Sequence, residues 1–221
     1  TGTAIAGATS LSYVPPTSAT GTLYYYCIAT YNSGGCTTAT SNIAQVIVNP
    51  IQTITTQPLA SQDICSGGTI APLTVAYTDG VGTATYQWYS NTTNANTGGT
   101  SISGANGSSY TPPVFNTTGD YYYYAMVSLS GSGCGSVASA TALVRVVADP
   151  TVTITPSSQT ICQNTTPTNL VVTPSGGVGT FSYQWYSNTT ASTTNSTLIP
   201  GATSATYTPS TAVVGTLYYY V

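Results

Sequence analysis

The sequence predicts an all-β protein built from tandem two-layer β-sandwich repeats of about 97 residues. Residues 86–93, with the sequence YQWYSNTT, recur letter for letter at 183–190, an offset of 97 residues. Within the repeat, apolar residues alternate with a period of two, and turn residues interrupt the pattern every eight to twelve positions. An exact internal copy together with strand-type alternation indicates an array of β domains.

Seven strands are expected in the complete repeat, and a tryptophan lies in the fourth of them. This count over about 100 residues is typical of an immunoglobulin-like sandwich, and a β-barrel is the alternative. We expect the strands at residues 51–55, 62–65, 73–78, 85–90, 108–111, 121–129 and 136–147.

The repeat divides the chain into three parts. We assign residues 1–49 to the C-terminal half of one repeat, 50–149 to a complete repeat, and 150–221 to the N-terminal part of a third. The joints are expected at Pro50 and Pro150, because proline prevents simple continuation of a strand ladder. We therefore expect the chain to be part of a longer protein.

The composition excludes whole classes of function. The chain has one Arg, four Asp, and no Lys, Glu or His, so charged residues make up 2% of it, against about 25% in an ordinary soluble domain. A nucleic-acid-binding protein needs several cations. Acid–base and nucleophilic catalysis need residues that are almost entirely missing here. We predict a protein that is not an enzyme, with no catalytic residues and no cofactor.

Alternation assigns the aromatic residues to two faces of the sandwich. The inward positions are expected to form the core, at Trp88, Trp185, Tyr25, Tyr123 and Tyr219. The outward positions are candidates for surface contacts, although cross-strand aromatic pairs that only stabilise the sheet are the favoured interpretation. These outward residues are Tyr89, Tyr122, Tyr124, Tyr186, Tyr218 and Tyr220.

The cysteines fit an oxidising environment better than a metal site, since no Cys-x-x-Cys or His occurs. Two pairings stay open for the disulfide candidates: a bridge within a repeat, and a bridge from Cys65 to the cysteine between the sixth and seventh strands of a neighbouring repeat. A third pairing, Cys27 with Cys36, has less support. The candidates are Cys65 and Cys134, with Cys162 and Cys36 as their equivalents in the other repeats.

The sequence also offers a candidate calcium site and candidate glycosylation sites. A calcium ion at Asp120 and Asp149 is disfavoured, because neither residue recurs in the other repeats. Glycosylation is left open, because Asn-x-Ser/Thr triplets arise by chance in a sequence of this composition and do not by themselves imply it. The triplets begin at Asn91, Asn106, Asn116, Asn164, Asn188 and Asn195.

Several motifs together resemble a known family. They are YQWY at 86–89, ISGA at 102–105, SYTPP at 109–113, QTIC at 159–162 and a Gly-Cys pair ending at 134. They are similar to the immunoglobulin-like repeats of giant surface proteins of the Bacteroidota, which are exported by type IX secretion and include adhesins of the gliding-motility type.

A related likeness concerns the sixth strand. Tyr25-Tyr26-Cys27 resembles the tyrosine corner and the following cysteine of antibody domains, but Val75 replaces the partner cysteine of the second strand. Cys27 is therefore expected to be a buried thiol.

The resemblance implies an extracellular location at the cell surface. The expected function is a structural stalk of a large adhesin or filament, whose partners are neighbouring repeats of the same chain. A carbohydrate-binding module is the alternative, with lateral self-association or surface polysaccharide as further partners. A functional amyloid is the third hypothesis, because uncharged, Tyr-rich strands lack the Lys that guards sheet edges. Neither nucleic acid nor membrane insertion is expected.

Overall fold

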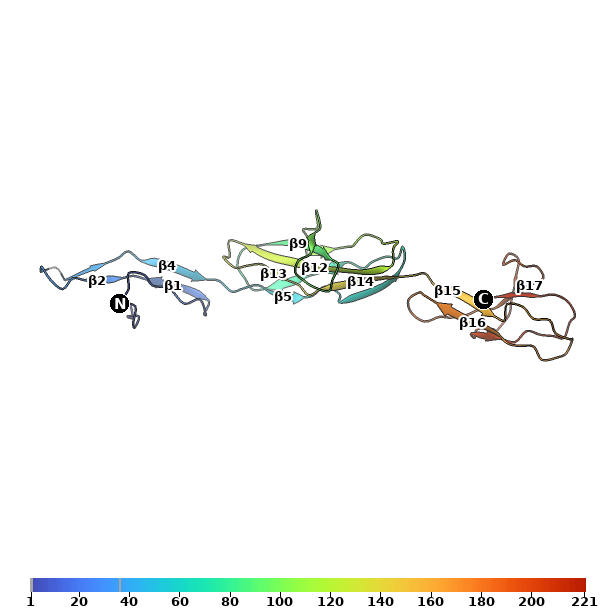
Figure 1. The fold of residues 1–221 in the computed structure, drawn as a ribbon. Helices are drawn as coiled ribbons and strands as arrows, with labels where there is room; N and C mark the ends of the chain where they lie inside the picture. Colours follow the sequence, from blue (N-terminus) through green and yellow to red (C-terminus); the bar gives the residue numbers. More distant parts are fainter. Residues whose placement is uncertain (1, 36) are drawn as a thin grey trace. The chain divides into compact units, whose positions relative to one another are not determined.

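The computed structural model describes residues 2–35 and 37–221, and all the regular structure in that part of the chain is β (Figure 1). The chain divides into two compact units. The first comprises Thr1–Pro58, Leu73–Tyr110 and Tyr123–Thr141, and the second Leu59–Pro72, Thr111–Tyr122 and Ala142–Val221.

Among the described residues, the first unit contains the two-stranded sheets and the β10–β9 end of the largest sheet. β1 pairs antiparallel with β4, β2 with β3, β5 with β8, β10 with β9 and β11 with β7. The strands are β1 (Gly21–Tyr25), β2 (Ile28–Thr30), β3 (Thr38–Thr40), β4 (Ala44–Val48), β5 (Thr53–Thr56), β7 (Leu73–Thr74), β8 (Ala76–Thr78), β9 (Thr83–Asn91), β10 (Thr100–Ser101), β11 (Ser109–Tyr110) and β13 (Val137–Ala138).

The second unit contains the third repeat and two strands of the complete one. Here β6 pairs in parallel with β14, β15 pairs with β16, β16 with β19, and β17 with both β18 and β20. The strands are β6 (Ser61–Cys65), β14 (Ala142–Val147), β15 (Thr151–Thr155), β16 (Leu170–Ser175), β17 (Tyr186–Asn188), β18 (Thr197–Leu198), β19 (Thr206–Tyr207) and β20 (Tyr218–Tyr220). The long β12 (Gly119–Ser130) has residues in both units.

The largest sheet has the strand order β10-β9-β12-β14-β6, with β13 also pairing to β12. The remaining strands of the complete repeat form the β5–β8 and β11–β7 pairs. Buried side chains come from both sets of strands, as expected for two layers that share a core. They include Leu73, Val75, Trp88, Tyr123, Ala125, Val127, Leu129, Ala142, Val144 and Val146. The complete repeat is an immunoglobulin-like β-sandwich.

Two of the expected strands are interrupted, each for a local reason. Residues 73–78 divide into β7 and β8 at Val75, whose N–H donates to Ser108 O over 2.9 Å. Residues 136–147 divide into β13 and β14 near Ser139, which is fully buried and whose hydroxyl accepts the N–H of Ala125 at 2.9 Å. At the first interruption the chain exchanges its neighbour, because β7 pairs with β11 and β8 with β5. At the second, β13 and β14 both pair with β12, and β14 also pairs with β6.

Candidate functional site

A tryptophan anchors the core of the complete repeat, and its side chain is completely buried. The Trp88 indole N–H donates to Gly107 O at 2.9 Å, so its one polar atom is satisfied. The ring lies 5.9 Å from that of Tyr110, which in turn lies 5.8 Å from Tyr123. Tyr110 therefore links the two expected core residues, and burial raises the pKa of its phenol.

The third repeat builds the same cluster. Trp185 is also completely buried and donates to Ser204 O at 2.9 Å. Its ring lies 5.6 Å from Tyr207, and Tyr207 lies 5.4 Å from Tyr219. Burial, with a smaller contribution from Tyr207, raises the pKa of Tyr219. The sequence reasoning missed Tyr110 and Tyr207, although a Tyr-Thr-Pro motif at both positions was a usable signal.

Tyr25 occupies the equivalent position in the first repeat. It is half-buried and packs against Tyr13, with the ring centroids 5.7 Å apart. Its surroundings differ from those of Tyr123 because residues 2–35 and 37–49 contain only the two-stranded sheets β1–β4 and β2–β3.

Cys27 is exposed, so the expectation of a buried thiol is wrong for this structure. The equivalent position in the complete repeat, Ala125, is fully buried. The position is therefore a core site, but the described residues of the first repeat supply no second layer to cover Cys27.

Two outward tyrosines of the complete repeat form an internal stack. The rings of Tyr89 and Tyr124 are 5.1 Å apart and nearly parallel, at 6°. Tyr124 is only 3% exposed, because Gly99 lies against its ring and donates its N–H to the Tyr124 hydroxyl at 3.2 Å. A Cβ at Gly99 would lie 2.9 Å from that ring. The expectation that Tyr124 faces solvent is therefore wrong, because the segment before β10 covers it.

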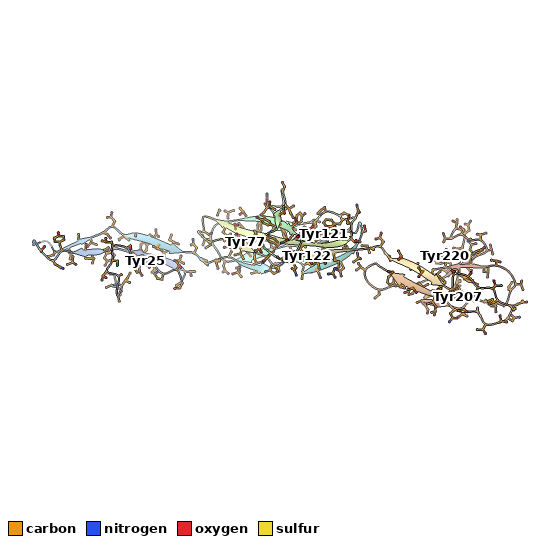
Figure 2. All side chains as sticks on the ribbon, viewed as in Figure 1. Tyr25, Tyr77, Tyr121, Tyr122, Tyr207 and Tyr220 are labelled. Carbon is orange, nitrogen blue, oxygen red and sulfur yellow. The ribbon has the colours of Figure 1, made fainter. Side chains whose placement is uncertain are left out.

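The stack recurs in the third repeat, where Tyr186 and Tyr220 lie 5.0 Å apart at 7° (Tyr220 is labelled in Figure 2). The Tyr220 hydroxyl donates to Thr193 O at 3.2 Å and also contacts the hydroxyl of Ser196. Both tyrosines are half-buried. These pairs have the geometry of cross-strand contacts that stabilise a sheet.

The last two outward candidates differ in exposure. Tyr122 is half-buried, and Tyr218 is 43% exposed. Other tyrosines are more exposed than either, namely Tyr24 at 65% and Tyr31 at 71%. The six candidates therefore do not form one uniform exposed stripe.

Glutamine side chains fasten the strands in both repeats. Gln87 donates to the carbonyls of Trp88 and Ile102, both at 2.8 Å, and Gln184 makes the same two bonds to Trp185 and Ile199 at 3.0 and 2.8 Å. Each amide thus ties the tryptophan strand to the residue that follows the next short strand.

Gln62 and Gln159 each form two hydrogen bonds with one backbone residue, one as donor and one as acceptor. Gln62 donates to Ala71 O at 3.1 Å and accepts the Ala71 N–H at 2.8 Å. Gln159 makes the same reciprocal pair with Thr168, at 2.9 Å in both directions. Both hydrogen-bonding groups of the backbone residue are thereby satisfied without a neighbouring strand.

An asparagine closes the turn after the tryptophan strand. The Asn91 amide donates to the carbonyls of Ala95 and Thr97, at 2.9 and 3.1 Å, while its oxygen accepts the N–H of Thr92 at 2.8 Å. Asn188 likewise donates to two carbonyls, those of Ser192 and Thr194. The Asn-Thr-Thr triplets at these positions therefore have a structural use that involves both amide hydrogens.

Three of the five charged residues cluster on one surface of the second unit. Arg145 contacts Asp120 over 2.9 Å, and the β14–β6 register places Arg145 opposite Asp63. The bond from Arg145 holds the pKa of Asp120 below its usual value. Asp120 is thus engaged by a cation, and in the described residues no group of three or more His, Cys, Asp or Glu side chains could hold a metal ion.

Two of the cysteines, Cys65 and Cys134, lie near the joints of the complete repeat. Cys27, Cys65, Cys134 and Cys162 are free thiols, and Cys36 lies outside the described residues, so a disulfide stays a prediction. The Cys134 sulfur lies 3.7 Å from Pro50 O and 3.9 Å from Asn49 O. Cys65 is in register with Val147, at the end of β14.

A groove of about 560 Å³ lies in the third repeat. Its apolar lining includes Ile154, Leu170 and Leu217. In the complete repeat, the buried residues Val144 and Val146 of β14 contribute to the equivalent core. We therefore interpret the groove as the open core of residues 150–221, rather than as a ligand pocket.

The fold and these clusters define the class of the protein, which is a tandem array of immunoglobulin-like β-sandwich repeats. The chain belongs to the family described as a domain of unknown function, DUF8696, whose model matches residues 54–148 and again 151–221. A search of curated protein sequences found no match.

Similar solved structures are extracellular domains 3–5 of Drosophila OTK (18% identity, TM-score 0.39) and immunoglobulin domains 1–5 of Sidekick-1 (16%, 0.38). The matches cover 73% and 78% of this chain, which spans 51% and 36% of those two structures. The fibronectin(III)-like modules of Clostridium thermocellum CbhA match at 17% identity and a TM-score of 0.33, over 76% of this chain and 91% of theirs. Among the described residues, no helix is long and apolar enough to cross a membrane.

Proposed function

We propose that these repeats are load-bearing segments of the stalk of an extracellular adhesin or filament, without a reaction of their own. The pairing of β6 with β14 carries this proposal. β6 lies near the start of the complete repeat and β14 ends it, and the two strands run parallel from the Leu143–Ser61 pair to the Val147–Cys65 pair.

Parallel terminal strands respond to tension in a specific way. When the two ends of the repeat are pulled apart, β6 and β14 are drawn in opposite directions along their length. The ladder between them is then loaded in shear, and its hydrogen bonds share the force instead of breaking one at a time. The ladder is bounded by the bonds from Leu143 N to Ala60 O at 2.9 Å and from Ser66 N to Val147 O at 3.2 Å.

The chemistry of the chain agrees with a structural role. Amide clamps and aromatic clusters recur in both repeats, whereas the charged residues do not recur. A scaffold has to repeat its packing but needs no catalytic group, and the chain has no His, Lys or Glu. The resemblance to Bacteroidota repeats adds cell-surface display, type IX export and gliding-type adhesion to the proposal.

The test stretches single molecules of the chain held by their two ends. The bonds at Ala60 and Ser66 place the even-numbered residues of β6 in the ladder, so proline at Ile64 removes a ladder donor. Asp63 is the matched control, because its N–H points away from β14 at the sheet edge. We expect Ile64→Pro to lower the unfolding force of the complete repeat and Asp63→Pro to change it little. Equal forces in wild type and Ile64→Pro would overturn the load-bearing role.

A further inference from the structure

Two cysteines of the complete repeat mark different joints. Cys134 lies at the joint before the repeat, where its sulfur contacts the carbonyls of Asn49 and Pro50. The Asn49 amide also donates to Ser132 O at 2.8 Å, which fastens the joint to the turn that carries Cys134. This turn therefore belongs structurally to the N-terminal joint of its repeat.

Cys65 lies at the joint that follows the repeat. It pairs in register with Val147, and the next residue, Ser66, donates its N–H to Val147 O at 3.2 Å. Pro150 follows Val147 by three residues. The backbone around Cys65 is thus bound to the last residue of β14, immediately before the chain enters the third repeat.

The sequence places both types of cysteine in successive repeats. Cys162 is the copy of Cys65 at an offset of 97 residues, and Cys36 is the copy of Cys134 at an offset of 98. Asp149-Pro150 occupies the position that Asn49-Pro50 has at the preceding joint. A following repeat that carries a Cys134-type residue would therefore place it against the carbonyls of Asp149 and Pro150.

We propose that each joint is closed by a disulfide between the Cys65-type residue of one repeat and the Cys134-type residue of the next. An extended segment from Val147 to Pro150 spans about 10 Å. A disulfide requires Cα atoms within about 7 Å. The staple therefore requires the two cysteine Cα atoms to lie closer together than the ends of the extended segment. The half-buried state of Cys65 and Cys134 leaves both thiols accessible for oxidation.

The bond forms by thiol–disulfide exchange with a small disulfide such as oxidised glutathione. One cysteine thiolate attacks this disulfide and releases one glutathione thiolate. The second cysteine thiolate then attacks the mixed disulfide and releases the other. Two protein thiols lose two protons and two electrons, and the glutathione disulfide is reduced to two thiols.

The experiment compares this chain with an extended chain in which residues 126–149 are repeated after Val221. Val221 occupies the position of Ala125, so the extension completes the third repeat and supplies a second copy of Cys134. Both chains are treated with oxidised glutathione, alkylated and mapped by mass spectrometry without reduction. Circular dichroism checks that each is folded.

In the extended chain we expect Cys65 to be linked to the added copy of Cys134, while the original Cys134 is alkylated or carries glutathione. Cys65→Ser removes the link, and the control Cys162→Ser keeps it. In the 221-residue chain Cys65 and Cys134 are each alkylated or carry glutathione, and they are not linked to each other. A Cys65–Cys134 link within the repeat, in either chain, would overturn the proposal, as would a Cys65 in the folded extended chain that is alkylated or carries glutathione. Neither result bears on the force that the β6–β14 ladder sustains.

Discussion

Replacing Trp88 with alanine is expected to remove most of the stability of the complete repeat. The side chain is completely buried, so truncation leaves a cavity that costs about 3–5 kcal/mol. It also leaves Gly107 O without its indole donor, which adds about 1–3 kcal/mol. Small domains have a total free energy of unfolding of only about 5–15 kcal/mol.

The phenylalanine variant separates these two contributions. Trp88→Phe keeps an aromatic ring beside Tyr110 but loses the donor to Gly107, so we expect a smaller cost of about 1–3 kcal/mol. The order wild type, Phe, Ala in decreasing stability follows from the structure.

Hydrogen exchange of the β9 and β12 amides, followed by mass spectrometry, measures this loss in the complete repeat. A loss of 3 kcal/mol corresponds to exchange that is about 100-fold faster, since each 1.4 kcal/mol is a factor of ten. Fluorescence of Trp185 reports on the third repeat as an internal control. Acceleration below tenfold in Trp88→Ala would refute the view that this indole holds the core.

Three further predictions test other parts of the structure. Gly99→Ala is expected to destabilise the complete repeat by about 1–3 kcal/mol, because the new Cβ would lie 2.6 Å from Ser90 O. Gly135→Ala is the control and should leave stability unchanged, because the space around its Cβ is open. Urea unfolding measures both. Asn91→Ala should cost about 1–3 kcal/mol, because both donor bonds and the acceptor are lost. Asn91→Asp should cost at least as much near pH 7, because a carboxylate oxygen would then face the carbonyl oxygens of Ala95 and Thr97; an unchanged stability of Asn91→Asp would contradict this account. Burial raises the pKa of Tyr86 and Tyr110 in the folded state, so the unfolded chain loses these protons first. The free energy of unfolding should therefore fall as the pH rises above about 10, and a flat profile from pH 9 to 11 would argue against it.

Period-two alternation predicted the sheet faces well where a residue packs directly against the opposite layer. Trp88 and Trp185 are both fully buried. Alternation says nothing about loops that fold back over the outer face, which is why Tyr124 was expected in solvent. The adjacent Gly98-Gly99 pair was a sign of a close backbone approach there.

The other differences also have physical causes. Tyr110 was expected only as part of a short strand, but the aromatic cluster depends on three strands that meet in space. Cys27 was assigned from a single strand pattern, and burial of that position also needs a second layer. The repeated glutamine and asparagine clamps depend on distances across turns, which spacing along the chain does not fix.

The direction of loading gives the most direct test of a stalk whose repeats resist tension through β6 and β14. The complete repeat is stretched first between handles at Pro50 and Asp149, which loads the ladder in shear. It is then stretched between handles at Gly67 and Asp149, which pulls the two strands apart from one end. The account predicts a clearly higher unfolding force in the first geometry. Equal forces in the two geometries would contradict it.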